Sequence, residues 1–576
     1  MKYTAKILAL LLAILMLFAS CDVLGMSNEQ GTDEVTTGAS TEAPTESETI
    51  SEETTEAQTE EETEDPYRAS ISRSREEIES MITLKDGEFE EAHAKLKEFE
   101  SIGLVSDDYD AVDAVYLEFE DMFYYLDTQI SLANIVYDLN HSDKEASSRY
   151  LDNYELFGDL YNEYMFTCRT LYLESPISEE LFADWSEDEI KYLLNYTAEI
   201  QDLREQNEEI LVEFNELRGA DAKNKKAELY VQIINNNNRI AELAGYDNYY
   251  LYAHSEIYGR DYSLEEIAAF KGYVIEYLLP KFDTLYNKWY NRYAKLNQNS
   301  RDDMLDFLYE PFDTLDKNYL EGYVNSFDNS TGEGFKNLFE NRNMIFSNAS
   351  NSHQSAYQTY LEDYETPFCL FGSDGQSTST IVHEMGHYYA SLYTPHVSSY
   401  DVAEIQSQAN EFLFLKYAKS EMASNVYSVV EGYNVYNTVA MILVCVVIDE
   451  FEQRVYSLES VDGYTLSDFN AIMKDVCEPY GGTKFFNNNI TDINDYWLSV
   501  CPNSPVYYIS YATSSISALS IYAIARSDEA AGRETYRKLI EEIEEDDGFK
   551  AALVKIGLTN PFQQETYEKL NVTVFK

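Results

Sequence analysis

The sequence is poor in basic residues and strongly acidic. Its 576 residues include 41 lysines and arginines against 104 aspartates and glutamates, which gives a formal net charge of −63. After the first few residues it has no extended basic cluster, so it lacks the electrostatic footprint of a protein that binds nucleic acid. The acidic excess favours solubility in an extracellular setting, and attraction of basic peptides is the alternative interpretation.

Cysteine is scarce and widely spaced. Once Cys21 is set aside, the remaining five cysteines form no CxxC pair and no framework of the kind that staples small secreted domains. We therefore expect mostly buried free thiols, while one bridge stays open in an exported chain. The five are Cys168, Cys369, Cys445, Cys477 and Cys501.

Long apolar runs are also missing. Residues 7–18 and 438–448 are apolar, but both runs are shorter than the roughly 20 residues that a permanent membrane span needs. We interpret the second run as part of a buried helix. The first follows Lys2 and Lys6 and is typical of an export signal.

Residues 18–21, Phe-Ala-Ser-Cys, resemble a bacterial lipobox, in which small residues precede the cysteine that receives the lipid. This predicts a signal peptide over residues 1–21. The mature protein would begin at acylated Cys21, anchored to the outer face of the cytoplasmic membrane. An ordinary signal peptide cleaved near Ser20 is the alternative.

Residues 22–66 predict a disordered tether. From residue 26 onward the segment is dense in Glu, Thr and Ser and almost free of large apolar residues, so it cannot bury a core. A flexible coil of this length spans roughly 35 Å, enough to hold a folded body away from a membrane surface.

The body that follows predicts a mainly α fold. From residue 67 to about 320, apolar residues recur at three and four positions, and strict alternation is rare. The many tyrosines are spread over the whole chain and are interpreted as core and groove filling. Glycine and proline mark the expected helix breaks, which are Ser175-Pro176, Gly219, Gly245, Pro280 and Pro311.

A different pattern appears at residues 364–372, YETPFCLFG. It predicts a short strand, with Pro367 better suited to an edge position than to a central one. An open edge near a metal could pair with an extended peptide, and a plain structural hairpin is the equal alternative.

The most informative stretch is IVHEMGHYYA, residues 381–390. In a helix, His383 and His387 lie one turn apart on one face and can bind one tetrahedral ion, while Glu384 can hold a water beside it. Gly386 is expected to leave room for a substrate backbone. The alternative is a surface helix whose histidines are solvated.

A third ligand is needed to complete such a site. The position that a metzincin would fill with histidine holds Tyr393. Further on, Glu404 and Glu411 are seven residues apart on one face of a predicted helix, so one could bind the metal and the other steady a ligand. His396 lies in the loop between the helices and is expected to be exposed rather than a ligand.

HEMGHYYA followed by VAEIQSQANE resembles the oligoendopeptidase F branch of the thimet oligopeptidase superfamily. This resemblance implies that Glu404 is the third zinc ligand and that Glu411 supports the site without binding the metal. Residues 239–253 also resemble a family element, and residues 504–519 resemble its active-site tyrosine segment. Motif-bearing similarity covers roughly residues 200 to 570.

In the tyrosine segment the resemblance assigns Tyr511 as the donor to the oxyanion and Tyr508 as its helper. The alternative is that both are packing tyrosines. Relatives place a histidine about eleven residues before that tyrosine, where this chain has Val500 and Cys501, and no histidine follows His396. The departure bears on rate and specificity rather than on reaction type.

The resemblance implies a two-lobed helical body around a deep substrate channel, with a small sheet beside the zinc helix. It divides the body into an N-terminal helical lobe at 67–200 and a catalytic domain at 201–576. The expected activity is zinc-dependent endopeptidase cleavage of short, unstructured peptides outside the cytoplasm, with Glu384 as base and one Zn²⁺ per chain. The alternatives are a peptide-binding lipoprotein with a residual zinc site, or a metallocarboxypeptidase.

Overall fold

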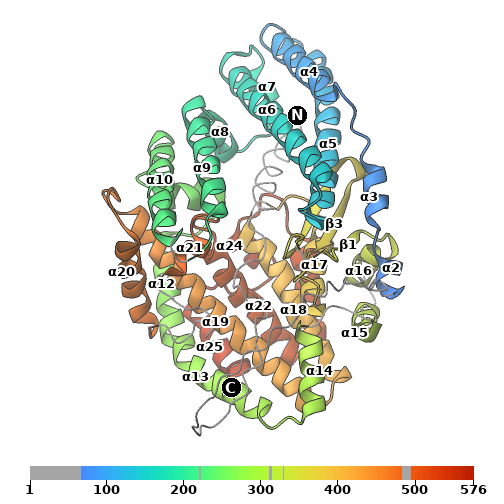
Figure 1. Ribbon diagram of the computed structural model, residues 1–576, viewed down its shortest axis with the longest axis vertical. Coiled ribbons are helices and arrows are strands. Elements are labelled where there is room, and N and C mark those ends of the chain that lie inside the picture. The colour runs from blue at the N-terminus through green and yellow to red at the C-terminus, as the bar shows by residue number, and fades with distance from the viewer. Residues whose placement is uncertain are drawn as a thin grey trace, which may run out of the picture.

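The computed structural model describes residues 66–219, 222–309, 314–327, 330–349, 351–397, 399–482 and 495–576. The expected signal peptide and Cys21 lie outside the described residues, as does the expected tether except for Pro66, which begins helix α2. The described part is built mainly from helices with one small sheet (Figure 1). The predicted fold class, mainly α with a small sheet, is confirmed.

The N-terminal helices form a long bundle, in which α4, α5 and α6 pack on one another. Asp108 and Asp143 accept backbone N–H groups at the starts of α5 and α6 and so stabilise these helix ends. The helices are α2 (Pro66–Ile71), α3 (Arg75–Met81), α4 (Glu88–Gly103), α5 (Tyr109–Leu139), α6 (Lys144–Glu174) and α7 (Ser178–Leu181).

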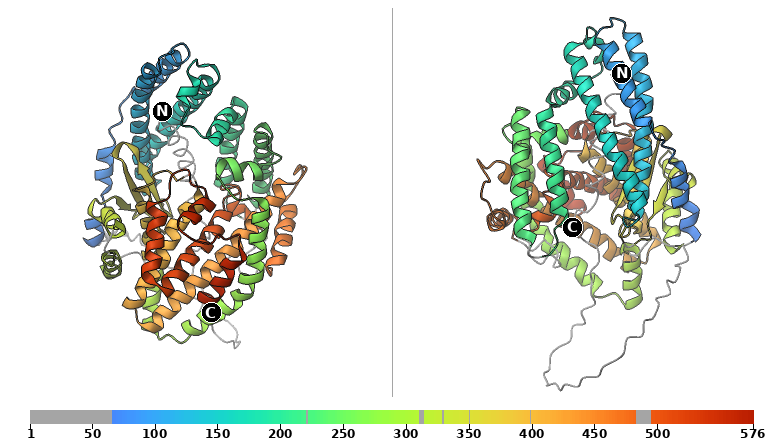
Figure 2. Two further views of the ribbon diagram at one scale, coloured as in Figure 1. Left: turned by 180° about the vertical axis from the view of Figure 1, so that it is seen from behind. Right: turned by 45° about the horizontal axis from the view of Figure 1, so that its top comes forward.

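A second group of helices follows in the chain. In Figures 1 and 2 its first helices, up to α10, stand on the opposite side of the upper half from the N-terminal bundle, while its last helices reach into the lower half. Its members are α8 (Glu187–Asn195), α9 (Ala198–Glu216), α10 (Ala222–Leu243), α11 (Tyr249–Tyr252), the π-helix η1 (Ala253–Ile257), α12 (Leu264–Tyr273), the π-helix η2 (Val274–Leu278) and α13 (Leu279–Tyr293).

The predicted helix breaks have different outcomes. Ser175 ends α6, and Gly219 and Gly245 follow the ends of α9 and α10, as expected. Pro280 does not break the path, because α12, η2 and α13 run on without a gap and the proline lies in the first turn of α13, where a missing N–H is tolerated. Pro311 lies outside the described residues.

Three strands form a mixed sheet that packs on α5 and on the later helix α17 (Thr378–Ser391). They are β1 (Met344–Phe346), β2 (Ala356–Leu361) and β3 (Thr366–Phe371), and their order in the sheet is β1-β3-β2. Along the chain, the 3-10 turn η3 (Glu362–Tyr364) connects β2 to β3. β3 is thus the central strand, but Pro367 itself has an edge position, as expected. Its ring is accommodated because β1 pairs with β3 only from Cys369 onward, so Pro367 faces a strand on the β2 side alone.

The remaining helices build the lower half. The helices before and around the sheet are α14 (Gln298–Tyr309), α15 (Thr314–Asn325), α16 (Ser330–Glu340), α17 (Thr378–Ser391), α18 (Tyr400–Glu421) and α19 (Ser424–Tyr456). The C-terminal ones are α20 (Leu466–Cys477), the 3-10 turn η4 (Glu478–Tyr480), α21 (Trp497–Val500), α22 (Ile509–Ser527), α23 (Glu529–Glu541), α24 (Phe549–Lys555) and α25 (Gln564–Thr573).

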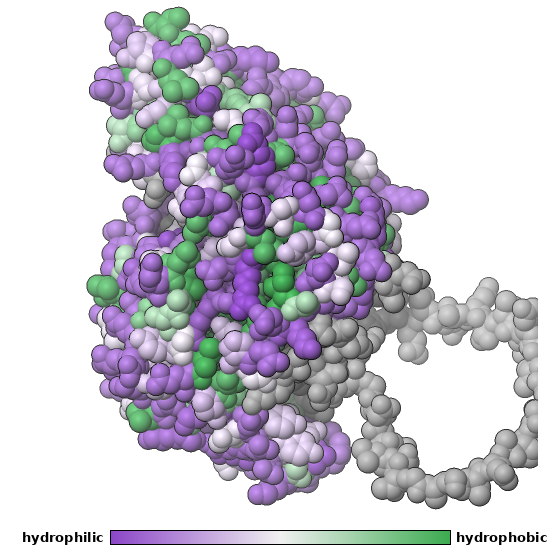
Figure 3. All heavy atoms as spheres, turned by 90° about the vertical axis from the view of Figure 1, so that its left-hand side faces the viewer, coloured by the Kyte–Doolittle hydropathy of each residue, from purple (hydrophilic) through white to green (hydrophobic). Residues whose placement is uncertain are grey.

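Two large apolar cores hold these groups together. One is confined to residues between Phe89 and Tyr196, and the other takes in residues from Ile200 to Phe575 together with Ile71. A small third core joins α5 to the sheet. The face shown in Figure 3 is mostly hydrophilic, in keeping with the acidic composition. The deep channel expected between the lobes stays a prediction.

Helix α19 contains the apolar run at 438–448. It is the one described helix that is long and apolar enough to cross a membrane by length and composition, and 67% of its most apolar window is buried inside the protein. Its side chains pack against α13 and α22, so it has the place of a core helix. The five cysteines of the body are all free and buried, as expected.

Candidate metal centre

Helix α17 carries the two histidines of the HEMGH stretch. It begins after Ser377, whose side chain accepts the backbone N–H of Thr380 and caps the helix. The rings of His383 and His387 lie one turn apart, with their centroids separated by 5.0 Å. Both side chains are only partly buried, so the expected helix forms and presents both imidazoles on one side.

Helix α18 approaches α17 so closely that only glycine fits between them. A Cβ atom added at Gly386 would lie 2.6 Å from the carbonyl oxygen of Gln406 and 2.7 Å from the Cα of Ser407. Such distances are shorter than van der Waals contact. The space at Gly386 is therefore filled by the backbone of α18, and the expectation that it is kept for a substrate backbone is wrong.

A buried asparagine locks the two helices in register. Asn410 of α18 donates its side-chain N–H to the carbonyl oxygen of Val382 in α17 at 2.6 Å, and its Oδ1 accepts from the Tyr323 hydroxyl at 2.6 Å. A buried amide whose nitrogen and oxygen are both hydrogen-bonded in this way favours one arrangement of its neighbours. The sequence motif contains Asn410, but nothing in the pattern singles out this role.

Three side chains bring potential metal ligands together. One ligand atom from each of His383, His387 and Glu404 lies within 4.8 Å of the other two, and His383 Nε2 is 3.7 Å from Glu404 Oε2. Ligands on one tetrahedral zinc at about 2.1 Å lie about 3.4 Å apart. The group therefore fits a zinc ion with only a small contraction.

The charges around the imidazoles also favour a cation. Glu384 is 1% exposed, and its Oε1 has no hydrogen-bond partner among the described residues. Burial, with Glu404 and Glu411 nearby, raises the pKa of Glu384 to about 7, and burial also raises the pKa of Glu404. Burial and the neighbouring His383 lower the pKa of His387 well below its ordinary value, which keeps that ring in the neutral form that a metal needs.

Glu411 holds His383 from the other side. Its Oε1 lies 2.7 Å from Nδ1 of His383, so the carboxylate accepts a hydrogen bond from Nδ1–H and leaves Nε2 facing Glu404 as an acceptor. Glu411 stands outside the group of three possible ligands. The resemblance assigned Glu404 and Glu411 these two positions.

The tyrosine segment reaches the site through Tyr507 as well as Tyr511. The Tyr507 hydroxyl lies 3.3 Å from Glu404 Oε1 and 3.2 Å from the Tyr511 hydroxyl. The ring of Tyr508 also lies near that of Tyr511, at a centroid distance of 6.3 Å, but Tyr508 has Tyr496 and Cys445 among its neighbours, and burial raises its pKa. The structure therefore brings the Tyr507 hydroxyl, rather than that of Tyr508, to Glu404 and Tyr511. Both residues precede α22, so helical periodicity does not set which of them reaches the site.

His396 is buried, which corrects the expectation of an exposed loop residue. Its Nε2 lies 2.7 Å from Oε1 of Glu362, and its ring meets the edge of Tyr360 at a centroid distance of 5.7 Å. The pair ties the loop after α17 to the end of β2. His396 stands outside the ligand group, as expected.

Val500 and Cys501 occupy the position of the family histidine. Both are buried in the main core, with exposures of 3% and 0%, and burial raises the pKa of the Cys501 thiol, which lies beside Tyr230. Cys501 stands outside the group of three candidate ligands, and neither side chain carries an imidazole that could replace that of the family histidine.

Comparison with known proteins gives a likeness at the level of structure. No family model matches the chain, and no curated protein matches it in sequence. PZ peptidase A, solved with an inhibitor, has a TM-score of 0.67 at 16% identity, covering 86% of this chain and 99% of its own.

Two further solved structures are similar. One is titled a putative oligoendopeptidase F, with a TM-score of 0.66 at 16% identity over 86% of this chain and 97% of its own. The other, a putative oligoendopeptidase F from Bacillus anthracis str. Ames, has a TM-score of 0.65 at 17% identity over 84% and 94%. The chain therefore has the fold of the oligoendopeptidase F and PZ peptidase structures, as its motifs implied.

Proposed function

We propose that the protein is a zinc-dependent endopeptidase that hydrolyses short peptides. The observation that carries the proposal is the meeting of His383, His387 and Glu404 beside the buried carboxylate of Glu384. The neighbours' printed names, oligoendopeptidase F and PZ peptidase, support a peptidase on the same fold.

His383, His387 and Glu404 would hold the zinc ion. Two imidazoles and one carboxylate are a donor set that zinc accepts while keeping a position open for chemistry. The same set also accepts cobalt or manganese, so the metal must be measured. When bound, zinc supplies Lewis acidity toward water and toward a peptide carbonyl.

Glu384 serves as the base. Its carboxylate takes one proton from the attacking water as the new carbon–oxygen bond forms, and it returns that proton to the amide nitrogen as the carbon–nitrogen bond breaks. The products are a carboxylic acid and an amine, so the atoms balance. The orphaned, buried Oε1 of Glu384 supports this role because it is available to a new donor.

Tyr511 serves as the donor to the carbonyl oxygen that gains negative charge. A phenol can do this without losing its proton, because its ordinary pKa lies near 10. The neighbouring Tyr507 hydroxyl, 3.2 Å away, can receive or pass on a hydrogen bond in the same chain. It also contacts Glu404 Oε1 and so keeps that oxygen turned away from His383.

The substrate is a short peptide in an extended conformation. β2 is an edge strand of the described sheet and packs against α17, so its outer side could pair with a peptide backbone beside the candidate ligands. This moves the pairing expected of residues 364–372 from the central β3 to β2.

The proposed location is outside the cytoplasm. A lipid on Cys21 and the acidic tether at 22–66 would hold the body near the outer face of the cytoplasmic membrane. The membrane is contacted through that anchor alone, and the acidic surface leaves no role for nucleic acid.

The test uses the chain without residues 1–21, so that it is not lipidated. It is assayed for metal and then given an internally quenched peptide with both ends blocked, with and without chelator. Internal cleavage that chelator abolishes and zinc restores is the expected result. Trimming only of peptides with a free C-terminus would mean a carboxypeptidase, and bound zinc with peptide binding but no cleavage would mean a peptide-binding protein.

A further inference from the structure

A buried ion pair lies behind the tyrosine segment and has no part in the chemistry above. The side chains of Arg260 and Asp401 are both 0% exposed, and Arg260 Nε lies 3.7 Å from Asp401 Oδ2. Removing two charges from water is costly, and an uncompensated one is costlier still. We therefore expect this pair to be compensated by further hydrogen bonds that hold the neighbouring segments in place.

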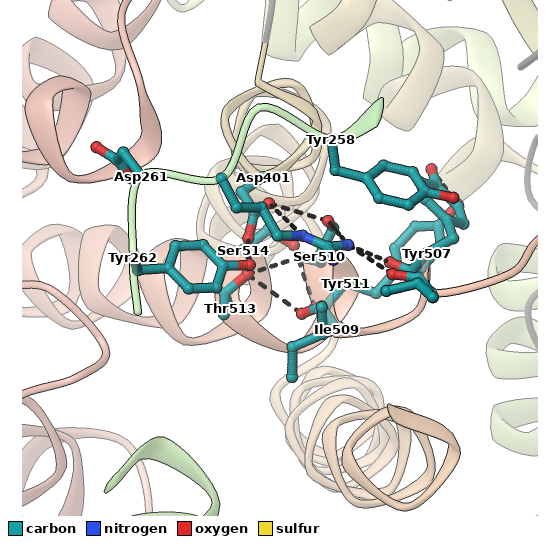
Figure 4. Close-up of polar contacts among 12 residues, drawn as sticks. Tyr258, Asp261, Tyr262, Asp401, Tyr507, Ile509, Ser510, Tyr511, Thr513 and Ser514 are labelled. Atoms are coloured by element: carbon teal, nitrogen blue, oxygen red, sulfur yellow. Dashed lines mark hydrogen bonds and ion pairs between the residues drawn. The ribbon is translucent and has the colours of Figure 1, made fainter. Parts of the chain in front are cut away.

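Arg260 uses a single nitrogen to bind the segment that carries Tyr507; Tyr507, Ser510 and Asp401 are labelled in Figure 4. Arg260 Nη2 donates to the carbonyl oxygen of Val506 at 2.7 Å, to that of Tyr507 at 3.3 Å and to the Ser510 hydroxyl at 3.0 Å. The guanidinium also lies 4.4 Å from the ring centre of Tyr258. The planar, always charged group is suited to such a stacked, multiply bonded place, and lysine is not.

Asp401 accepts hydrogen bonds from residues at the end of the same segment and just beyond it. Its Oδ2 accepts from the Ser510 hydroxyl at 2.9 Å, and its Oδ1 accepts from the hydroxyls of Tyr262 and Thr513. Asp401 lies in the first turn of α18, three residues before Glu404. The pair therefore joins the helix of a candidate metal ligand to the start of α22.

The segment held by this pair is strained. Val506 has a φ of 64°, a conformation that a β-branched residue rarely adopts and that persists only where its surroundings impose it. Its N–H donates to the buried Glu452 Oε1 at 2.8 Å, and its carbonyl receives the Arg260 bond. The peptide groups on both sides of the Val506 Cα are thus fixed, and the next side chain along is Tyr507.

We propose that Arg260 and Asp401 are positioning residues for the metal centre. The pair holds residues 506–511 against the start of α18, and in this way it keeps the Tyr507 hydroxyl on Glu404 Oε1 so that Oε2 faces the two histidines. Neither residue touches metal or substrate. The inference rests on the proposed function only in taking Glu404 as a metal ligand.

The test is a double-mutant cycle on Co²⁺ binding, read from the affinity and the visible absorption spectrum. The variants are Arg260→Lys, Tyr507→Phe and the two combined. Each single variant is expected to weaken Co²⁺ binding about 10-fold, as loss of a ligand's supporting hydrogen bond does. Both single variants are also expected to change the visible absorption spectrum in the same way. The double variant is expected to match the weaker single one, because Arg260 acts through Tyr507.

Two further variants serve as a second test and as a control. Ser510→Ala removes the hydroxyl that links Arg260 to Asp401, and it is expected to shift Co²⁺ affinity in the same direction by a smaller factor even if Arg260→Lys does not fold. Lys271→Met breaks another deeply buried ion pair, with Asp449 at 2.7 Å, and is expected to leave the Co²⁺ spectrum unchanged.

Independent, multiplying effects of Arg260→Lys and Tyr507→Phe would overturn the inference, as would an unchanged spectrum in Arg260→Lys and Ser510→Ala. A protein that binds Co²⁺ with this coupling but cuts no peptide would overturn the proposed function alone. A protein that binds no Co²⁺ would overturn both.

Discussion

Helices α5 and α18 both bury a run of polar side chains, but the partners of those side chains differ. In α5, Thr128 and Gln129 accept backbone N–H groups of Asp363 and Leu84, which fastens the helix to η3 and to the segment after α3. In α18, Glu404 instead faces two imidazoles and two further carboxylates. Burial of polar groups alone therefore does not indicate a functional site. A site is indicated where several buried side chains that can bind a metal meet at one place.

The two helices also differ in how their charges are compensated. On α5, Asp138 accepts a hydrogen bond from the Tyr357 hydroxyl at 2.8 Å, an ordinary neutral partner. Around α18 the carboxylates of Glu404 and Glu411 lie close enough to Glu384 to help burial raise its pKa, and Glu411 acts on Glu404 in the same direction. An excess of buried negative charge beside neutral imidazoles is what a divalent cation would neutralise.

The two regions are expected to differ most in turnover when one buried carboxylate is removed from each. Glu384→Gln is expected to keep bound zinc and to lower kcat by about 10³-fold, because the base is lost while the ligands stay. Steady-state hydrolysis of the quenched peptide and a metal assay measure the two effects. Asp127→Asn on α5 is the matched control and is expected to keep its turnover. Full turnover in Glu384→Gln would remove that residue from the mechanism.

The next test concerns the close approach of α17 and α18. Gly386→Ala forces a methyl group onto the α18 backbone and is expected to destabilise the fold by about 1–3 kcal/mol and to weaken zinc binding. Thermal unfolding with and without zinc measures both.

Gly158→Ala is the control for that substitution. Gly158 lies within α6, and an added Cβ would meet nothing within 4 Å. Alanine is favoured over glycine in a helix by about 0.5–1 kcal/mol, so this variant is expected to be slightly more stable than the wild type. Equal effects of the two substitutions would mean that the α17–α18 contact has no special tightness.

A smaller effect is expected when the support of His383 is changed. Glu411→Gln keeps the shape of the side chain but removes the charge that faces Nδ1 of His383, and zinc affinity is expected to fall about 10-fold. A competition assay against a chelator gives the affinity. Glu421→Gln, at the exposed end of the same helix, is expected to leave it unchanged. Equal affinities of the two variants would argue that Glu411 only packs against the histidine.

The sequence predicts the parts of this site that lie on single helices. His383 and His387, and likewise Glu404 and Glu411, are brought to one face by helical periodicity, which is local. Tyr507 could not be chosen over Tyr508 in this way, because both precede α22 and the strained Val506 sets the direction of the chain.

Other features depend on contacts between distant segments. His396 is buried because Glu362, more than thirty residues earlier, pairs with it, and Gly386 is required because the α18 backbone lies against it. Arg260 has no motif around it that marks a role, and its importance follows only from the carbonyl groups that the fold brings to it. Tertiary contacts of this kind leave no periodic signal in a single sequence.

The smallest expected effect lies on α5 and concerns stability rather than turnover. Asp127 is 1% exposed, its Oδ1 has no hydrogen-bond partner among the described residues, and burial together with Glu362 raises its pKa well above the ordinary value. The folded protein therefore holds this proton to a higher pH than the unfolded chain does. The folded state is favoured by Asp127 below the unfolded pKa, near 3.9, and loses that advantage as the pH rises toward the folded pKa.

Asp127→Asn replaces the carboxyl with a neutral group of the same shape and removes this dependence. The variant is expected to unfold at a higher temperature than the wild type at pH 8, with a smaller difference at pH 5, because the wild type must keep a buried carboxyl protonated against a rising pH. Thermal unfolding of both proteins at the two pH values measures the effect. A difference that shrinks from pH 5 to pH 8 would show that the Asp127 charge is compensated in the folded state, and α5 would then resemble α18 in needing a cation.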